Sequence, residues 1–324
     1  MRIHVRAAGA IVWRRRGRKI EVLLVHRPTW NDWSIPKGKV KGVETLPECC
    51  VREIKEETGV DIVLGIPIDV QRYRLPGGKR KEVRYWLAQE LSEAHLLRAR
   101  PAIKRAPRSE VDKVIWCDVR TARKKLSTAA DRTTLEKAVA AINAGAAEYV
   151  VKIWVRHARA RKRASWAGEE SDRPLTRSGQ RRAAGVNAIL SAYGVRDLVT
   201  SPWKRCAHTL RSYARSSRIV LRKCPALTET AYLHHPDAFA NEIKTIMCTQ
   251  DSLAACVHRP TLPAILDILG RYAKPAIRRR FPADDPWLKT AEVLVVHTLP
   301  SQSQPRIVAV ERFRPADSCG QTGK

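Results

Sequence analysis

The sequence predicts an α/β protein with two domains, each containing a sheet that helices cover. The chain has 324 residues, which is more than a single domain usually holds. Along the chain, segments in which apolar and polar residues alternate, as in strands, are interspersed with segments that have the apolar periodicity of helices. Near the middle, the small-residue stretch NAGAAEY interrupts this order, and a new apolar strand, VVKIWV, begins at Val150. We therefore expect one domain on each side of this connector.

In the first half, alternating apolar and polar residues predict five strands, and two segments predict helices. One helix is expected over Leu46 to Thr58 and another over about Thr133 to Asn143, where it would close the unit. The predicted strands span residues 4–13, 19–27, 61–75, 82–91 and 112–119.

The segment GKVKGVETLPECCVREIKEETGV, residues 38–60, contains the most informative pattern of the chain. In a helix, Glu53, Glu56 and Glu57 have the spacing i, i+3 and i+4, so their carboxylates project from one face. Like charges at this spacing repel each other, and Mg²⁺, which takes oxygen ligands, would offset the repulsion and also grip polyphosphate. The alternative for a shorter pattern is a solvated acidic face.

This segment resembles the Nudix box, the signature of hydrolases that cleave nucleoside diphosphates linked to another group. The resemblance implies an α/β/α sandwich with a mixed sheet. It also implies that Glu53, Glu56 and Glu57 are together the metal ligands and the base that activates water. Arg52 would orient Glu53, and Glu44 would brace the loop. The implied ion is Mg²⁺, with Mn²⁺ as the alternative.

Basic and aromatic residues around the box favour the same interpretation. Lysine and arginine side chains suit phosphate binding. The segment KEVRYWLA, residues 81–88, alternates like a half-buried strand and puts Tyr85 beside the expected site, where it could stack on a base. It is similar to a segment of MutT-type enzymes and diadenosine polyphosphate hydrolases, and by the same resemblance Glu110 would be a further acidic ligand. The expected substrate-binding residues are Arg27, Lys37, Lys39, Lys81 and Tyr85.

In the second half, polar residues follow predicted strands, and the segments between them read as amphipathic helices. Open parallel sheets bind ligands at the carboxyl ends of their strands, so these residues are expected to gather there. Arginine side chains would hold phosphoryl oxygens, one imidazole would attack phosphorus, and a carboxyl group would protonate the leaving oxygen. The residues concerned are Arg156, His157, Arg205, Glu229 and His258.

Their order resembles the histidine phosphatase superfamily, which implies a three-layer α/β domain. By this resemblance His157 is the phosphorylated nucleophile, Glu229 is the acid, and Arg156, Arg205 and His258 form the anion pocket. Three departures are visible: Ala158 replaces a usual glycine, His208 stands where glutamine is common, and Arg259 follows the second histidine.

Together the halves are similar to two-domain MutT-type proteins in which a Nudix unit is fused to a histidine phosphatase. The expected domains are residues 1–143 and 149–316, followed by a polar tail over 317–324. The implied function is Mg²⁺-dependent hydrolysis of nucleoside polyphosphates, either oxidised guanine nucleotides such as 8-oxo-dGTP and 8-oxo-GTP or diadenosine polyphosphates. The second domain would then dephosphorylate the product.

The net charge of +29 attracts polyanions in general and keeps another class of function open. The alternative is a basic module that binds RNA or senses nucleotides, with one or both sites inactive, although no basic and aromatic RNA signature supports it. Eight cysteines without a Cys-x-x-Cys pair, and no apolar leader, predict a cytoplasmic protein. We expect a nucleoside polyphosphate partner, no membrane and no specific nucleic acid; homo-oligomer formation is left open.

Overall fold

The computed structural model describes residues 3–301 and 304–316, and the chain divides into two compact units. The predicted tail, 317–324, lies outside the described residues. Residues 94–100, which the sequence analysis placed in the first domain, belong to the second unit, where Arg100 Nε donates to Ser191 Oγ at 3.0 Å. The first unit comprises Met1–Glu93 and Pro101–Ala147, and the second comprises Ala94–Arg100 and Glu148–Lys324.

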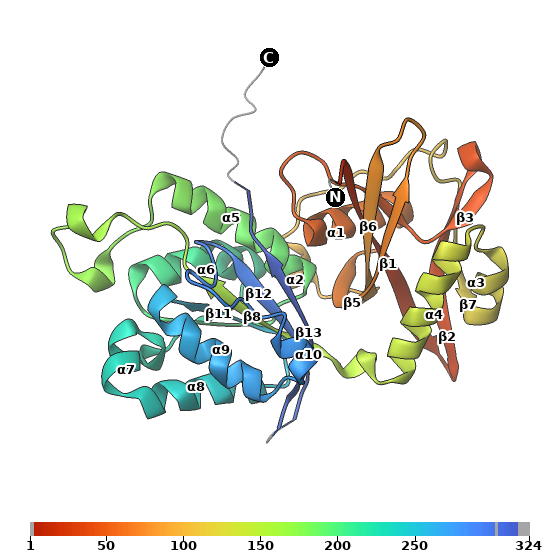
Figure 1. Ribbon diagram of the computed structural model, residues 1–324. Helices are drawn as coiled ribbons and strands as arrows, with labels where there is room; N and C mark the ends of the chain where they lie inside the picture. The colour runs from red at the N-terminus through yellow and green to blue at the C-terminus, as the bar shows by residue number, and fades with distance from the viewer. Residues whose placement is uncertain (1–2, 302–303, 317–324) are drawn as a thin grey trace, which may run out of the picture. The chain divides into compact units, whose positions relative to one another are not determined.

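A seven-stranded mixed sheet forms the centre of the first unit (Figure 1). Its strands are β1 (Val5–Arg16), β2 (Lys19–Arg27), β3 (Asp32–Ser34), β4 (Lys37–Lys39), β5 (Ile62–Arg74), β6 (Arg80–Glu90) and β7 (Lys113–Asp118). The order is β3-β2-β1-β6-β5, with β4 paired to β1 and β7 paired to β2; only β1 and β6 run parallel. All five predicted strands are present. The short strands β3 and β4 were missed because three residues carry no periodicity.

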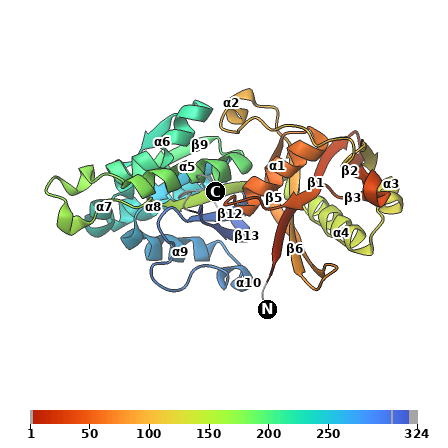
Figure 2. The ribbon, with the colours of Figure 1, turned by 90° about the horizontal axis from the view of Figure 1, so that it is seen from above.

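The helices of this unit are α1 (Leu46–Thr58), α3 (Val119–Lys125) and α4 (Ala129–Asn143). The predicted bounds of α1 are confirmed. Thr45 and Glu48 form a capping box at its start, and Gly59 ends it with φ of 77° in the left-handed region that glycine favours. Helix α4 begins four residues before the prediction, because the Thr128 side chain caps it. Helices α1 and α4 lie on opposite sides of the sheet, which confirms the sandwich (Figures 1 and 2).

The second unit is built on a six-stranded sheet of order β10-β9-β11-β8-β12-β13. The first four strands in this order are parallel, whereas β12 and β13 are antiparallel to their neighbours. Every residue of β11 is buried, as expected for a strand covered on both faces. The strands are β8 (Val150–Arg156), β9 (Asp197–Thr200), β10 (Leu221–Lys223), β11 (Leu253–Val257), β12 (Val293–Leu299) and β13 (Arg306–Phe313).

Helices cover both faces of this sheet, which confirms the predicted three layers. Helices α5 and α6 lie on one face, and α8 and α9 lie on the other (Figure 1). The α-helices are α2 (Ala94–Leu97), α5 (Arg177–Ala192), α6 (Lys204–Ser217), α7 (Glu229–His234), α8 (Pro236–Cys248), α9 (Leu262–Arg271) and α10 (Pro275–Arg278). The 3₁₀ turns of the whole chain are η1 (Pro28–Trp30), η2 (Ala146–Glu148), η3 (Arg163–Ser165), η4 (Glu170–Asp172), η5 (Pro225–Leu227) and η6 (Arg259–Thr261).

Two features of this fold position the candidate sites. In the first unit, β4 pairs with β1 and lies beside α1. The backbone of Lys37 in β4 therefore reaches the carboxylate of Glu57 on the helix. In the second unit, the carboxyl ends of β8, β11 and β9 are neighbours, because these strands pair in parallel. Among residues 3–301 and 304–316, no helix has the length and apolar character needed to span a membrane.

Candidate active sites

Three of the four glutamates of α1, Glu53, Glu56 and Glu57, lie together on one side of the helix, where Glu53 and Glu57 meet β4. Glu53 and Glu57 are each only 5% exposed, whereas Glu56 is half-buried. Charged carboxylates are rarely buried without partners. The arrangement therefore requires compensating cations or donors close to this face of the helix.

Arg52 supplies much of that compensation. Its Nη1 donates to Glu53 Oε1 at 2.7 Å and to Glu56 Oε2 at 2.9 Å, and its Nε donates to Glu44 Oε2 at 2.9 Å. Glu44 in turn accepts the backbone N–H of Lys41 at 2.6 Å. These contacts agree with the expectations that Arg52 orients Glu53 and that Glu44 braces the loop.

Strand β4 approaches the buried glutamates closely. The backbone N–H of Lys37 donates to Glu57 Oε2 at 2.9 Å. Next to it, a Cβ on Gly38 would lie 2.0 Å from Glu53 Cδ, so only glycine leaves space for this carboxylate. The loop therefore determines where the oxygens of Glu53 and Glu57 lie.

The ionisation of this cluster indicates that a further cation would stabilise it. Burial raises the pKa of Glu57 to about 8, although the positive charge of Lys37 opposes the shift. Burial also raises the pKa of Glu53, against the hydrogen bond from Arg52. A divalent cation favours ionised carboxylates, so the donor set of Glu53, Glu56 and Glu57 fits one chemically.

The ligands are not already arranged around a common point. Within the described ranges, no group of three His, Cys, Asp or Glu side chains has the geometry to hold a metal ion. The physical reason is that Arg52 and Lys41 take up the oxygens: Lys41 Nζ lies 2.9 Å from Glu56 Oε2. A metal ion would compete with these two cations for the same carboxylates.

The expected phosphate-binding residues Arg27, Lys37, Lys39 and Lys81 lie close enough together for their charges to affect one another. Burial, followed by the charges of Lys37, Lys39 and Arg27, lowers the pKa of Lys81 to about 8. Lys39 is exposed, and Lys37 Nζ donates to Ile35 O at 3.1 Å. Arg27 is the least available of the four, because its Nε and Nη2 both bond to the Asp32 carboxylate.

The stacking role expected for Tyr85 does not agree with the structure. Tyr85 is 0% exposed and packs in the core between the sheet and α4 with Val83 and Leu87. The alternation of β6 places residues 83, 85 and 87 on one face of the sheet. The ring is therefore part of the core. Its hydroxyl is buried without a hydrogen-bond partner.

Glu110 is not joined to the acidic cluster. It is exposed, and its side chain makes no hydrogen bond or ion pair with the three glutamates in the described part of the chain. Sequence reasoning missed a different acid, Asp131 of α4. This residue is 2% exposed. The hydrogen bond with Asp32 is the main cause of the raised pKa of Arg27, and burial is the main cause for Tyr73; the charge of Asp131 adds to both shifts.

In the second unit, the expected residues come together at the carboxyl end of the parallel strands. Arg156 ends β8 and His157 follows it, while His258 follows β11 directly. The backbone N–H of His157 donates to Val257 O at 3.1 Å, and the two imidazole centroids are 5.6 Å apart. Glu229 begins α7 and bonds to Arg205 near the start of α6.

His157 is held in one orientation and one tautomer. Its Nδ1 lies 2.8 Å from the carbonyl oxygen of Ala158, which can only accept, so Nδ1 carries the proton and Nε2 keeps a lone pair. Burial and the charge of His258 hold the pKa of His157 well below its usual range. Thr209 Oγ1 accepts the N–H of Ala158 at 2.9 Å and thereby supports this loop.

The pKa of His258 is shifted in the opposite direction. Burial disfavours its charged form, yet the Cys206 sulfur and the Glu229 carboxylate raise its pKa. Its Nδ1 lies 3.2 Å from Glu229 Oε1, and its Nε2 lies 2.8 Å from Ser201 Oγ. Burial alone would raise the pKa of Glu229, but the hydrogen bond and charge of His258, together with Arg205, lower it to about 2.

Two arginines whose charges act on His157 each have a buried Nε without a hydrogen-bond partner. Arg205 is 0% exposed; its Nη2 donates to Glu229 Oε1 at 2.8 Å, and its Nε is buried without a partner. Arg156 Nη1 donates to Leu288 O at 2.7 Å, and its Nε is likewise buried and unpartnered. Buried donors without acceptors are costly, and an anion would satisfy them.

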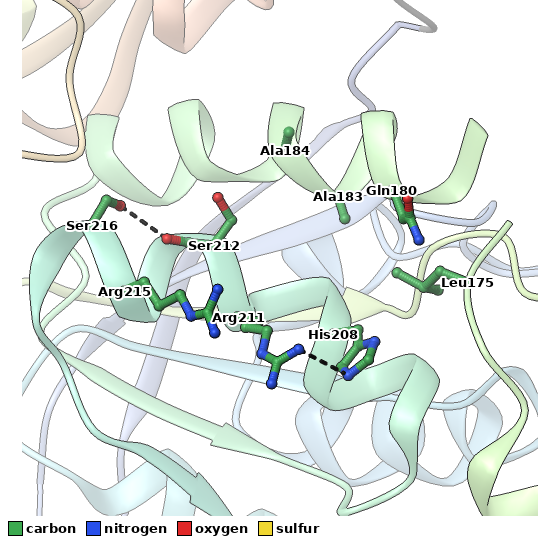
Figure 3. Close-up of a pocket in the computed structure, with 9 residues that line it drawn as sticks. All are labelled: Leu175, Gln180, Ala183, Ala184, His208, Arg211, Ser212, Arg215 and Ser216. Atoms are coloured by element: carbon green, nitrogen blue, oxygen red, sulfur yellow. Dashed lines mark hydrogen bonds between the residues drawn. The ribbon is translucent and has the colours of Figure 1, made fainter. Parts of the chain in front are cut away.

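Sequence reasoning also missed Glu170, which contacts Arg205 from the mostly exposed segment 161–172. Glu170 Oε1 lies 3.2 Å from Arg205 Nη1 and 2.7 Å from Arg173 Nη2. No sequence signal separates this glutamate from its neighbour Glu169. Of the three departures, Ala158 is at the site, Arg259 follows His258 directly and pairs with Asp285, and His208 lies on α6 (Figure 3).

Comparison with known proteins confirms both family resemblances. Residues 3–138 match the model of the NUDIX domain, and residues 153–247 match the histidine phosphatase superfamily (branch 1). An 8-oxo-(d)GTP phosphatase of Mycolicibacterium smegmatis is 31% identical over 272 residues, which cover 81% of this chain and 80% of the relative. The chain therefore belongs to the Nudix hydrolases that carry a C-terminal histidine phosphatase domain.

Two further matches each cover part of the chain. An asymmetrical bis(5'-nucleosyl)-tetraphosphatase of Caenorhabditis elegans is 33% identical over 89 residues, 26% of this chain and 64% of that protein. A putative phosphohistidine phosphatase SixA from Nakamurella multipartitia has a solved structure with 22% identity and a TM-score of 0.36, covering 52% of this chain and 96% of that one.

Proposed function

We propose that the first unit hydrolyses a phosphoanhydride bond in nucleoside polyphosphates and that the second removes a terminal phosphate from the product. Two names support the substrate class: the relative that spans most of the chain is an 8-oxo-(d)GTP phosphatase, and another is a tetraphosphatase of dinucleotides. Oxidised guanine triphosphates, and diadenosine polyphosphates as the other candidate, are the proposed substrates.

In the first unit, Glu53, Glu56 and Glu57 would hold Mg²⁺ or Mn²⁺. A bound divalent ion would polarise the phosphoryl oxygens and acidify water. Glu57 has the raised pKa that suits a general base near neutral pH, and Lys37 keeps its Oε2 in place. Lys37, Lys39 and Lys81 would bind the phosphates. Arg27 would join them only through its remaining donors, because Asp32 already engages two.

In the second unit, the Nε2 lone pair of His157 would attack the terminal phosphorus. The bond from phosphorus to the leaving oxygen breaks, and Glu229, having taken up a proton from solvent when the substrate binds, would give it to that oxygen. The carboxylate would then accept a proton from the water that hydrolyses the phosphohistidine. Glu229 is ionised at rest, since its pKa is about 2. A bound phosphate would engage Arg205 and His258 and add negative charge beside Glu229, and both effects raise its pKa.

The observation that carries this proposal is the state of His157: buried, neutral, and with its Nδ1 proton committed to Ala158 O. A structural histidine at a strand end has no need of a free Nε2 near the buried, unpartnered Nε atoms of Arg156 and Arg205. This combination is what nucleophilic attack on phosphorus requires.

Chromatography of products from a panel of nucleotides tests the proposal with the parent chain, Glu57→Gln and His157→Ala. We expect Glu57→Gln to stop the first hydrolysis, and His157→Ala to leave it intact while a diphosphate accumulates. His234→Ala, an exposed histidine of the same unit, is the control. If the parent consumes no nucleotide but binds RNA with steep salt dependence, the chain is a basic binding module instead.

A cytoplasmic location is also part of this proposal. The seven cysteines of the described residues are all free, which suits a reducing compartment. Reaction with a thiol reagent in the freshly isolated protein checks it: a protein whose thiols are all oxidised on isolation contradicts this location.

A further inference from the structure

Arg163 is an exposed cation beside the proposed acid Glu229, and the proposed reaction gives it no role. It belongs to the 3₁₀ turn η3 in the segment between β8 and α5, and 69% of its side chain is exposed. Its Nη2 lies 3.6 Å from Glu229 Oε2 and 3.2 Å from Glu170 Oε1. A cation at this position can act on whatever group Glu229 protonates.

The two carboxylate oxygens of Glu229 have different surroundings. Oε1 accepts a hydrogen bond from Arg205 Nη2 at 2.8 Å and lies 3.2 Å from His258 Nδ1. Within residues 3–301 and 304–316, Oε2 accepts no hydrogen bond, and its ion-pair contact is with Arg163. An oxygen that already accepts from two donors is less able to take up a proton. Oε2 is therefore the oxygen that would carry the proton, so the leaving group would lie on the side of Arg163.

Arg163 is held loosely by its protein partners. Its Nε and Nη2 donate to the Glu170 carboxylate at 3.4 and 3.2 Å, which is long for charge-assisted hydrogen bonds. Arg173 binds the same carboxylate at 2.9 and 2.7 Å, and only 12% of its side chain is exposed. Arg205 Nη1 adds a contact at 3.2 Å. Glu170 therefore keeps two arginines if Arg163 turns to another anion.

This cluster of ion pairs has an excess of positive charge. Arg163, Arg173 and Arg205 face two carboxylates, those of Glu170 and Glu229. Burial alone would raise the pKa of Glu170, but hydrogen bonds from Arg173 and Arg163 lower it to about 2. The pKa of Glu229 is also about 2, so both carboxylates are ionised near neutral pH. One positive charge remains for a ligand, and Arg163 is the most exposed of the three arginines.

The leaving group of a nucleoside diphosphate fits this position. When His157 Nε2 bonds to the terminal phosphorus, the bond to the bridging oxygen breaks, and a nucleoside monophosphate leaves with the proton from Glu229. The second phosphorus is bonded directly to that bridging oxygen, so its other oxygens lie close to Glu229 Oε2 and within reach of Arg163. A guanidinium binds phosphate oxygens through parallel N–H donors. An ester with a neutral leaving group offers it no such partner.

We propose that Arg163 is a specificity-determining residue of the second site, which binds the phosphate of the leaving group and thereby favours nucleoside diphosphates over esters with a single phosphate. This inference rests on the proposed phosphatase function. When the substrate binds, the guanidinium exchanges its long contacts with Glu170 for the leaving phosphate. That phosphate gains negative charge as the bond breaks, so the contact strengthens in the transition state.

The test compares Arg163→Gln with Lys162→Gln, which removes the exposed cation one residue earlier in the same segment. Phosphate release from GDP and from p-nitrophenyl phosphate is measured in EDTA, which removes the metal ions that the first site needs. Loss of one charge-assisted contact should lower kcat/KM for GDP about tenfold or more. The value for p-nitrophenyl phosphate should stay close to that of the parent. Arg163→Lys, which keeps the charge without the fork of donors, should recover part of the loss.

Equal kcat/KM values for Arg163→Gln and the parent with GDP, or an equal loss in Lys162→Gln, overturn the inference and leave the His157 proposal standing. A loss of the same size with β-glycerophosphate also overturns it. This ester needs the proton donor but has no second phosphate, so Arg163 would then act only by positioning Glu229. A parent that hydrolyses p-nitrophenyl phosphate but not GDP contradicts the inference as well. If the parent releases phosphate from none of these compounds, the phosphatase proposal fails, and the role of Arg163 fails with it.

Discussion

His157 and His258 lie at the carboxyl ends of neighbouring parallel strands with their ring centroids 5.6 Å apart, and their surroundings favour opposite charge states. Burial lowers the pKa of His157, whereas contacts with Cys206 and Glu229 raise the pKa of His258. One imidazole is thus prepared to donate electrons and the other to bind an anion. A phosphoryl group needs both functions at once.

Replacement of Glu229 by glutamine tests its role as a proton donor. A general acid contributes about 10²–10⁴-fold when the leaving group is poor, and much less when it is good. Glu229→Gln should therefore slow an alkyl phosphate far more than p-nitrophenyl phosphate, measured as kcat. Glu148→Gln, an exposed acid of the same unit, is the control. Equal losses for both compounds would assign Glu229 a positioning role only.

The same carboxylate predicts an acid limit to stability. The folded-state pKa of Glu229 is about 2, below the ordinary value of 4.5, so the folded chain binds fewer protons than the unfolded chain between these values. The contribution is present above about pH 4.5 and is lost as the pH falls towards 2. It is on the order of 2 kcal/mol. Thermal midpoints from pH 6 to 2 should fall more steeply for the parent than for Glu229→Gln. Parallel curves contradict the prediction.

Gly38→Ala should separate the two activities. The added Cβ would lie 2.0 Å from Glu53 Cδ, so the carboxylate must move away from β4. Misplacing one ligand by about an ångström costs roughly a hundredfold in rate. We expect loss of this size in the first hydrolysis and none in phosphate release by the second unit. Gly65→Ala, which meets only ordinary contacts from 3.4 Å, is the control.

Removal of divalent ions should have the same selectivity. Glu53 and Glu57 are buried and have raised pKa values, so they need a cation to act as ligands in the ionised form. EDTA should stop the first hydrolysis, and Mg²⁺ should restore it, with Mn²⁺ as the alternative ion. Release of phosphate from p-nitrophenyl phosphate should continue in EDTA. If chelation stops both reactions, the metal-free assignment of the second site is wrong.

Local signals were sufficient for the elements that carry the sites. Helix α1 was predicted with correct bounds from a pattern confined to one short segment, and the residues that set those bounds, the capping box of Thr45 and Glu48 and the left-handed Gly59, also act within a few residues. Strand β4 was missed, since its three residues become a strand only by pairing with β1. Tyr85 was placed at the site because apolar and polar residues alternate along its strand. Both faces of the sheet are covered by helices, and the alternation does not tell which face carries the site and which carries the core.

The sequence by itself determined which chemical groups are present and in what order: the acidic face of α1, and the arginines and histidines that follow β8, β9 and β11. These follow from residue identity and spacing along one segment. Only the tertiary structure decided the charge states of Glu57, His157 and Glu229, and it alone revealed that Glu170 contacts Arg205. A pKa depends on burial and on charges brought near by distant segments, and the spacing of residues along the chain does not contain that information.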